Sequence, residues 1–586
     1  MGKRAPATAG PGGVGAAAPH FPVGVERPSR RTNAVQIGRA VTARKFAGVL
    51  LRSAACQAVG VAGVCVLIAS LHAHNDGLWF QGDAPRHAAN GLFWWDLLTA
   101  VPADPAKFAL SYYARYPAIN PVAYPPFFYL VEALMLGALG TTTYVVRMAV
   151  VGFAALSAIY TQAWARRWIA LEAGWAGVFV LLAPGIVLWA NAILPNIPAM
   201  AMSMALLYHF RQWLETSSRT QLILAGMAGL AVVLTYYLAV VVIGVCLVWS
   251  LGHARWRNVA RWGLVWAWAA AIAVVFGALW VVTAILIPLY LSKHTVPTPT
   301  FLLRPATWTY YWRALPELTG LASLIIGLGG LAAAFRTPRW RTEAALLSSW
   351  IAVVIVGYSI LPARDVRYIL LSVPAILLAA ASGVIVLLQR LPAIGEVWRV
   401  LAFASIMGLA GYSAANVPVP RASGFREVAE YLRLHAPNEA VLYDGYYDGN
   451  FVFYVRAHDP KFEQRVVLGS QLLYHYGPRS TFDWVETSEV ASEKDVAEVI
   501  RSRCGCRWLA VEIGPRSEGA ATQRLLRRAI HGSAFEPMGS FQVAANGTER
   551  VELYRLSGPI PSERSATLRF PAFTDRVFTG IEPISR

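Results

Sequence analysis

Three ionisable side chains, Asp83, Arg86 and His87, lie within a five-residue segment of the sequence. Residues three and four positions apart share a helix face, so one carboxylate would lie beside two cations. Such a carboxylate can deprotonate a hydroxyl or bind a metal ion while a cation holds a phosphate group. The same segment also fits an ordinary helix start, with Asp83 as N-cap and Pro85 in the first turn. These residues alone leave both interpretations open.

A second charged segment, Arg364-Asp365-Val366-Arg367-Tyr368, lies much later in the chain. It is either a phosphate clamp or an ion pair that fixes a tight turn. Further polar residues stand at the ends of apolar runs, at Tyr124, Asn196 and Tyr236. A single such residue often only anchors a helix at the membrane edge, whereas a set that meets at one face indicates a functional site.

The elements that position these residues are predicted to be membrane helices. The 586 residues are 56% hydrophobic and 14% charged, whereas a soluble protein carries roughly 25% charged residues. The apolar runs are near the length of about 20 residues that spans a bilayer. The fold class is therefore a polytopic α-helical membrane protein.

The net charge of +18 does not indicate nucleic-acid binding. Basic residues gather in the N-terminal tail and in short loops, which is the positive-inside pattern of membrane topology. Residues 1–45 are predicted to be a disordered basic cytoplasmic tail. Residues 46–416 form the transmembrane part, with outer loops at about 72–123 and 290–316.

About eleven crossings follow from this pattern, with the N-terminus inside. The segment from Tyr124 to Gly140 is short and is not counted, because the next span must begin outside to end at Arg166 and Arg167. The predicted crossings are Phe46–Leu71, Tyr144–Trp164, Gly174–Ala192, Ile197–Trp213, Leu222–Leu234, Leu238–Leu251, Leu264–Leu289, Leu318–Phe335, Ala344–Leu361, Ile369–Leu388 and Val397–Ala415.

The composition changes after Pro418, and residues 417–586 are predicted to form a small extracytoplasmic α/β domain. Helices alternate there with short β-rich runs. The predicted helices are Phe425–Leu434 and Glu493–Arg501, and the predicted strands are Ala440–Tyr443, Phe451–Val455 and Trp508–Glu512. A lid over the substrate and a plain structural cap are both compatible with this pattern.

Several short motifs occur in a characteristic order over residues 46–390. They are Gly82-Asp83 after the first span, Tyr124-Pro125-Pro126, Thr143-Tyr-Val-Val-Arg147, Ile193-Leu-Pro-Asn196-Ile-Pro198 and Arg364-Asp-Val-Arg-Tyr368 before Pro374. In order and topology they resemble the GT-C integral-membrane glycosyltransferases, especially the protein O-mannosyltransferase and aminoarabinose transferase branch.

This resemblance implies a polyprenyl-phosphate sugar as donor and transfer on the outer face of the membrane. It implies that Asp83 activates the acceptor hydroxyl or binds a metal, and that Arg86, Arg364 and Arg367 hold the donor phosphate. The helix that follows Tyr124 would line the cavity. The predicted substrate-binding set is completed by His87, Asn196, Tyr236, Asp365 and Tyr368.

The sequence departs from the family pattern at three positions. Ala84 stands where many relatives carry a glutamate, Asn196 where they often carry an aspartate, and Tyr236 where the aminoarabinose branch has a lysine. Asparagine is a poorer ligand than aspartate for a hard cation. Mg²⁺ or Mn²⁺ is therefore only weakly supported as a cofactor, and the substrate of the aminoarabinose branch is not expected.

The function expected from these observations is transfer of a sugar to an acceptor hydroxyl of a lipid, glycan or protein, with inversion of the anomeric configuration. The protein is expected in the cell (inner or plasma) membrane. The partners would be a polyprenyl-phosphate sugar and membrane lipid, and no nucleic acid. The alternative is a non-catalytic protein that binds or transports polyprenyl lipid on the same scaffold.

Overall fold

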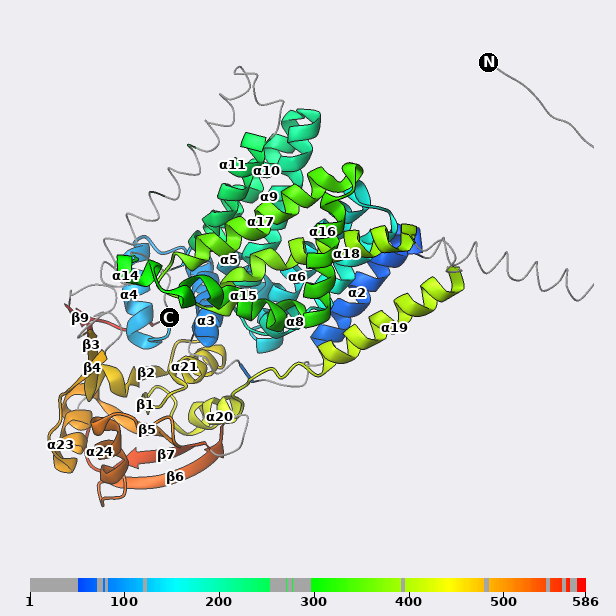
Figure 1. Ribbon diagram of the computed structural model, residues 1–586. Helices are drawn as coiled ribbons and strands as arrows, with labels where there is room; N and C mark the ends of the chain where they lie inside the picture. Colours follow the sequence, from blue (N-terminus) through cyan, green and yellow to red (C-terminus); the bar gives the residue numbers. More distant parts are fainter. Residues whose placement is uncertain are drawn as a thin grey trace, which may run out of the picture.

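The computed structural model describes residues 51–70, 77–78, 83–119, 124–252, 270, 277, 297–390, 396–478, 484–543, 549–560, 565–569 and 577–585. Helices before residue 416 form one bundle, and a mixed β-sheet with its own helices follows at one end of that bundle (Figure 1). The tail predicted at 1–45 lies outside these residues, and so does the span predicted at Leu264–Leu289 apart from residues 270 and 277.

The helices of the bundle alternate with short 3-10 segments. In chain order they are α2 (Ala54–Ser70), α3 (Asp83–Ala100), α4 (Pro105–Arg115), α5 (Phe127–Leu139), α6 (Thr143–Trp168), η1 (Glu172–Trp175), α7 (Ala176–Leu182), α8 (Pro184–Ala190), α9 (Asn196–Thr216), α10 (Arg219–Thr235), η2 (Tyr237–Val240), α11 (Val241–Gly252), α14 (Pro299–Leu302), α15 (Pro305–Thr319), α16 (Leu321–Phe335), η5 (Pro338–Trp340), α17 (Arg341–Ser359), η6 (Val366–Ser372), α18 (Val373–Arg390) and α19 (Glu396–Ala415).

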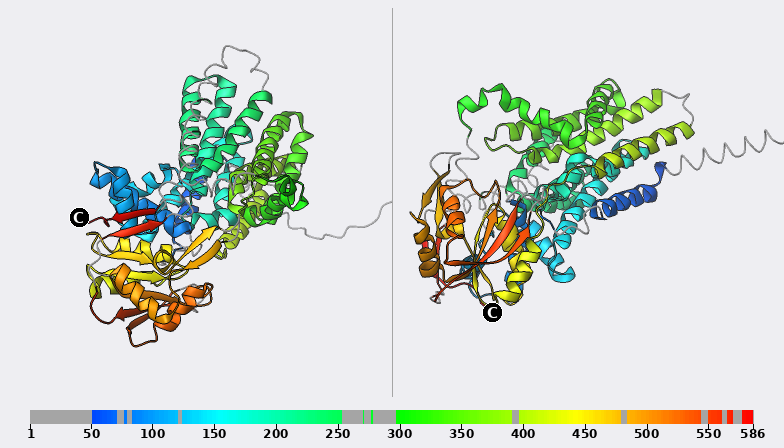
Figure 2. Two further views of the ribbon diagram at one scale, coloured as in Figure 1. Left: turned by 90° about the vertical axis from the view of Figure 1, so that its left-hand side faces the viewer. Right: turned by 90° about the horizontal axis from the view of Figure 1, so that it is seen from below.

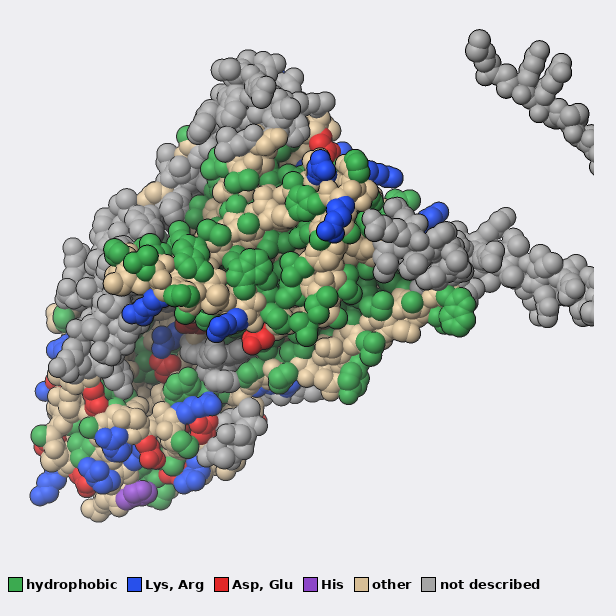
Figure 3. All heavy atoms as spheres, in the orientation of Figure 1, with side chains coloured by type: hydrophobic (Ala, Val, Ile, Leu, Met, Phe, Trp, Pro, Cys, Tyr) green, Lys and Arg blue, Asp and Glu red, His purple; other side chains and the backbone are tan. Residues whose placement is uncertain are grey.

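Three helical segments in the described part of the chain are long and apolar enough to cross a membrane, namely Thr143–Trp168, Pro338–Ser359 and Val366–Val386. Two bent helix pairs raise the number to five if each pair is one span. Figure 3 shows hydrophobic side chains over the helical part, whereas charged side chains gather on the C-terminal part. The chain therefore has the surface of a membrane protein, and the number of about eleven crossings stays a prediction.

The span predicted as continuous over Gly174–Ala192 is broken. Helices α7 and α8 meet at an angle of 53°, and Ala183 between them has an extended backbone with φ −63° and ψ 131°. Pro184 causes this break, because proline disfavours the helical conformation of the residue before it. The segment predicted as a loop at 290–316 also differs from the prediction, because its residues from Pro305 onward belong to helix α15.

Helix direction separates two ends of the bundle. Helix α9 begins at Asn196 and carries Arg211 about 22 Å further along its axis. At that far end Arg211 forms an ion pair of 2.6 Å with Glu343 at the start of α17. The basic residues Arg166 and Arg167 likewise lie in the last turn of α6. The polar residues at the start of α9 are thus separated from the basic residues at the other end of the bundle.

The C-terminal part contains a five-stranded sheet in the order β2-β1-β5-β7-β6. Strands β2, β1 and β5 are parallel, and β7 and β6 are antiparallel to their neighbours. Figure 2 shows this part from two further sides. The elements are α20 (Phe425–His435), β1 (Ala440–Asp444), α21 (Asp448–Ala457), β2 (Arg465–Leu468), α22 (Gly469–Leu472), β3 (Tyr474–Pro478), β4 (Trp484–Ser488), α23 (Glu493–Val499), η7 (Ile500–Cys504), β5 (Cys506–Ile513), α24 (Ala521–Ala529), β6 (Phe535–Gln542), β7 (Arg550–Leu556), β8 (Ala566–Arg569) and β9 (Val577–Ile581).

The strand predicted at Phe451–Val455 is wrong, because this segment lies in helix α21. All residues from Gly449 to Arg456 are buried, so the helix has no polar face that would give its sequence a 3.6-residue period. The other predicted helices and strands of this part coincide with α20, α23, β1 and β5 to within a few residues.

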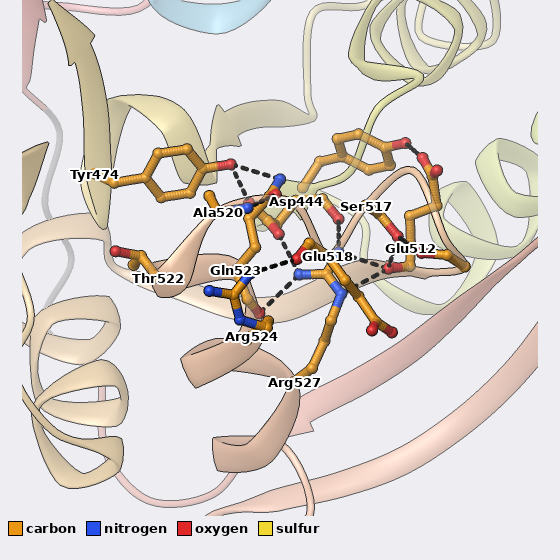
Figure 4. Close-up of polar contacts among 12 residues, drawn as sticks. Asp444, Tyr474, Glu512, Ser517, Glu518, Ala520, Thr522, Gln523, Arg524 and Arg527 are labelled. Carbon is orange, nitrogen blue, oxygen red and sulfur yellow. Dashed lines mark hydrogen bonds and ion pairs between the residues drawn. The ribbon is translucent and has the colours of Figure 1, made fainter. Parts of the chain in front are cut away.

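The carboxyl ends of the parallel strands β1 and β5 are filled by an arginine. In open α/β sheets ligands bind in the crevice at this edge. Here Arg527 of α24 donates to Asp444 at the end of β1, with 2.7 Å between Nη1 and Oδ2, and to the Glu512 carbonyl oxygen (Figure 4). Both side chains of the Arg527–Asp444 pair are buried. The guanidinium therefore occupies the position that a ligand would take and joins α24 to the sheet.

Glu512 makes the stability of this sheet dependent on pH. Burial raises the pKa of Glu512 to about 7, compared with about 4.3 in an unfolded chain. Between these values the folded protein keeps a proton that the unfolded chain releases, so the free energy of unfolding falls as pH rises, by about 4 kcal/mol in total. We expect Glu512→Gln to remove most of this decline.

To measure this dependence, the full-length protein in detergent is heated at pH values from 4.5 to 7.5. Unfolding is monitored by the onset of proteolytic cleavage within residues 440–556. Glu536→Gln, at an exposed position of β6 in the same sheet, is the matched control and should keep the wild-type decline. Equal declines in both variants would contradict the assignment to Glu512.

Candidate active site

A pocket lies where several helix ends of the bundle meet. Seven of the ten predicted site residues line it, which are Asp83, His87, Tyr124, Asn196, Tyr236, Arg367 and Tyr368. The lining is completed by Leu194, Pro195, Tyr237, Leu238, Leu361 and Ala363. Its volume is about 50 Å³, several times the roughly 10–15 Å³ that one water molecule requires. The pocket thus has room for a small polar group and has aromatic and apolar walls.

Helix ends and helix breaks deliver these side chains. Asp83 and His87 lie in the first turns of α3, and Asn196 starts α9 directly after Pro195. Tyr236 has an extended backbone that separates α10 from η2. At each of these positions a regular helix begins or ends, and all of them lie at the same end of the bundle. Residues from segments far apart in sequence consequently meet in one pocket.

Arg367 lies between two carboxylates. Its Nη2 is 3.1 Å from Asp83 Oδ2, and its Nε is 3.0 Å from Asp365 Oδ2. Asp365 also caps the 3-10 segment η6 by accepting from the Arg367 backbone N–H. The Arg367 side chain is 14% exposed and that of Asp83 is 47% exposed. The guanidinium is therefore held firmly by Asp365, whereas the Asp83 carboxylate is open to the pocket.

The charges around Asp83 keep its carboxylate ionised. Burial opposes ionisation, but His87, which is protonated at the low pH where Asp83 titrates, and the cations Arg367 and Arg86 together hold the pKa of Asp83 below its usual value. Burial lowers the pKa of His87 to about 4, so its imidazole is neutral at neutral pH and the two arginines supply the positive field there. Asp83 is consequently a carboxylate over the physiological pH range.

His87 is fixed by an aromatic residue that the motifs do not include. Its Nδ1 lies 2.5 Å from the Tyr129 hydroxyl in helix α5, and its ring lies edge-on to Tyr124 at 4.6 Å between centroids. Both His87 and Tyr129 are buried. Tyr129 follows the Tyr-Pro-Pro motif by a few residues on the same short helix, which is the one sequence signal that could have identified it.

Three predicted site residues do not line the pocket. Arg86 forms an ion pair of 2.7 Å with Asp448 of helix α21. Arg364 donates to the Thr307 hydroxyl at 2.7 Å and lies over the Phe301 ring at 4.4 Å, so it joins η6 to the α14–α15 region. Asp365 supports Arg367 from outside the pocket.

The residues of the pocket do not fit a resident Mg²⁺ or Mn²⁺. These hard cations favour several carboxylate and carbonyl oxygens. Asp83 is the one carboxylate among the lining residues, and it already faces the Arg367 guanidinium. No group of three His, Cys, Asp or Glu side chains suited to a metal ion occurs in the part of the chain that the structure describes.

Solved structures show the same architecture. ArnT from Cupriavidus metallidurans bound to undecaprenyl phosphate is similar with a TM-score of 0.53 and 14% identity, over 86% of this chain and 98% of that chain. In its apo state the TM-score is 0.55 at 14% identity, over 84% and 97% of the two chains. Arabinofuranosyltransferase AftD from Mycobacteria gives a TM-score of 0.50 at 15% identity, over 88% of this chain and 41% of that chain.

These similarities extend over the bundle and beyond it, and they confirm the GT-C fold that the motifs predict. No protein-family model and no curated protein matches the chain.

Proposed function

We propose that this protein is a glycosyltransferase that moves a sugar from a polyprenyl-phosphate donor to an acceptor hydroxyl at the outer face of the membrane. The observation that carries the proposal is the pair formed by Asp83 and Arg367 in one pocket of a GT-C bundle. An ionised carboxylate and a guanidinium are the two groups that this transfer requires at neighbouring positions.

The chemistry divides between the two side chains. The Arg367 guanidinium holds the donor phosphate. As the bond between sugar C1 and the phosphate oxygen breaks, the phosphate gains negative charge, which the guanidinium stabilises. The Asp83 carboxylate takes the proton of the acceptor hydroxyl, whose oxygen forms the new bond to C1 from the opposite side. The products are the glycosylated acceptor and polyprenyl phosphate, and the anomeric configuration is inverted.

Two further features support the lipid-linked donor. Undecaprenyl phosphate is bound by ArnT, which has a similar fold. The tyrosine rings of Tyr236 and Tyr368 lie 6.3 Å apart along the pocket wall, and aromatic faces pack well against the apolar faces of sugars. The basic residues at the far end of the bundle support an outward-facing pocket by the positive-inside rule.

The experiment is turnover of a panel of radiolabelled polyprenyl-phosphate sugars by the purified protein and by Asp83→Asn. Release of sugar-free polyprenyl phosphate by the wild type, and its loss in the variant, is the expected result. Binding of donors without turnover under all conditions would instead support the non-catalytic lipid-binding alternative, which is favoured by Asn196 at the position where relatives carry an acid.

Chelation of metal ions is expected to leave the rate unchanged. The pocket offers one carboxylate, and Arg367 already supplies the positive charge that a cation would contribute at the phosphate. Initial rates with EDTA, and with added Mg²⁺ or Mn²⁺, should agree with each other within about twofold, since no charge-stabilising ion worth several kcal/mol is lost. A complete loss of turnover in EDTA that Mg²⁺ restores would contradict this expectation.

A further inference from the structure

We propose that helix α21 of the C-terminal part positions the catalytic helix α3, and that Arg456 is the main positioning residue. This inference rests on the proposed function, because it assigns to α21 the task of holding Asp83 and His87 at the pocket. Helices α21 and α3 pack against each other (Figure 1).

Ion pairs join the two helices near both of their ends. At the start of each helix, Arg86 lies 2.7 Å from Asp448. Further along, Arg456 Nη2 lies 2.6 Å from each carboxylate oxygen of Asp96. The paired residues follow in the same order along both helices, so the two helices run side by side in the same direction. Two separated pairs fix both the rotation and the axial position of α3.

The pair between Arg456 and Asp96 is the stronger of the two attachments. The two side chains are 8% and 2% exposed. The Tyr112 hydroxyl of α4 donates to Asp96 at 2.8 Å, and the Arg456 guanidinium lies over the Phe462 ring at 4.4 Å. The Arg456 Nε also donates to Asp96 Oδ2 at 3.0 Å. A planar guanidinium that binds a carboxylate through two nitrogens in a buried site is poorly replaced by lysine.

Close backbone contact accompanies the charges. A Cβ atom on Gly449 of α21 would lie 3.1 Å from Pro85 and 3.3 Å from the Arg86 side chain, which places the first turn of α21 against the first turn of α3. Asp83 lies in that same turn of α3. A small movement of α21 is thus transmitted to the residue that faces Arg367.

The remaining contacts extend this attachment to α4. The Tyr116 hydroxyl donates to Asp459 at 2.6 Å, and Arg115 donates to the Gln464 carbonyl oxygen at 3.0 Å. Near the start of α6, the Thr141 hydroxyl donates to the Ala457 carbonyl oxygen. The C-terminal part consequently contacts the helices around the pocket, and its role is the support of the site.

The test compares Arg456→Lys with a matched control, Arg527→Lys. The Arg527–Asp444 pair is buried to the same degree, with side chains 8% and 0% exposed. It joins α24 to strand β1 (Figure 4), and α24 lies away from α3 (Figure 1). Both variants lose a buried pair. A purely structural role would therefore affect them equally.

Two measurements on the full-length protein in detergent separate the roles. In Arg456→Lys we expect faster amide hydrogen exchange over residues 83–100 and a kcat about 10- to 100-fold lower, since a misplacement of about 1 Å can cost 100-fold. The donor Kd should stay close to the wild-type value, because Arg367 is unaffected. In Arg527→Lys, exchange over residues 83–100 and kcat per folded molecule should match the wild type.

A double variant, Asp96→Leu with Arg456→Met, keeps the test decisive if the single variant does not fold. An apolar pair of similar volume can replace a buried ion pair without loss of folding, so slow exchange over residues 83–100 and kcat should both return toward the wild type. Unchanged exchange and kcat in Arg456→Lys, or low kcat in the double variant despite slow exchange, would overturn the proposal. Absence of turnover in the wild type would overturn the proposed function, while the exchange comparison would still decide the positioning role.

Discussion

Asp83→Asn is expected to lower kcat by about 100- to 10,000-fold, the contribution of a general base. Asparagine has the same shape but accepts no proton. Donor binding should be retained or become tighter, because Arg367 loses a carboxylate that competes with the donor phosphate for its guanidinium. Single-turnover rates and the Kd of polyprenyl phosphate measure the two effects separately.

Asp104→Asn is the matched control for this substitution. Asp104 precedes α4, lies in the segment that follows α3, and accepts from the backbone N–H groups of Ala106 and Lys107. Asparagine is an equally good N-cap, so activity should stay at the wild-type level. A wild-type kcat in Asp83→Asn would remove Asp83 from the chemistry.

Arg367→Ala is expected to weaken donor binding by about 10- to 150-fold, which corresponds to about 1.5–3 kcal/mol for a hydrogen bond to a charged group. The loss also removes the cation that pairs with Asp83, so the carboxylate repels the phosphate more strongly. Arg367→Lys should recover part of the affinity, because the charge remains but the planar fork is lost. The Kd of polyprenyl phosphate is the direct measurement.

Arg313→Ala serves as the control for a lost positive charge, because Arg313 is an exposed residue of α15 and does not line the pocket. The two pocket variants should differ in kind: Asp83→Asn chiefly lowers kcat, and Arg367→Ala chiefly raises Kd. The same change in Kd in both variants, with kcat unaltered, would argue against the division of roles.

Polar residues at helix ends were the most informative part of the sequence. Asp83, Asn196 and Arg367 stand beside apolar runs, and the topology alone predicted that they would meet. The bundle was predictable for the same reason, since runs near the bilayer thickness leave few alternatives. The break at Pro184 was also readable, because proline restricts the preceding residue, but the prediction treated that span as continuous.

The contacts between the bundle and the C-terminal part could not be predicted. Arg86 was assigned to the donor phosphate because it follows Asp83 by three residues, whereas its carboxylate partner Asp448 lies 362 residues away. No local pattern records such a pairing. Helix α21 was predicted as a strand because it is buried on all sides and lacks a helical period.

The same separation of 362 residues sets a time for maturation of the protein. At a synthesis rate of about 5–20 residues per second, a ribosome needs roughly 20–70 s to proceed from Arg86 to Asp448. During this interval α3 is already made but has no α21 to dock against. Nascent chains in the membrane thus pass through a stage with an incomplete pocket, and the proposed activity can begin only after the C-terminal sheet has been translated and folded.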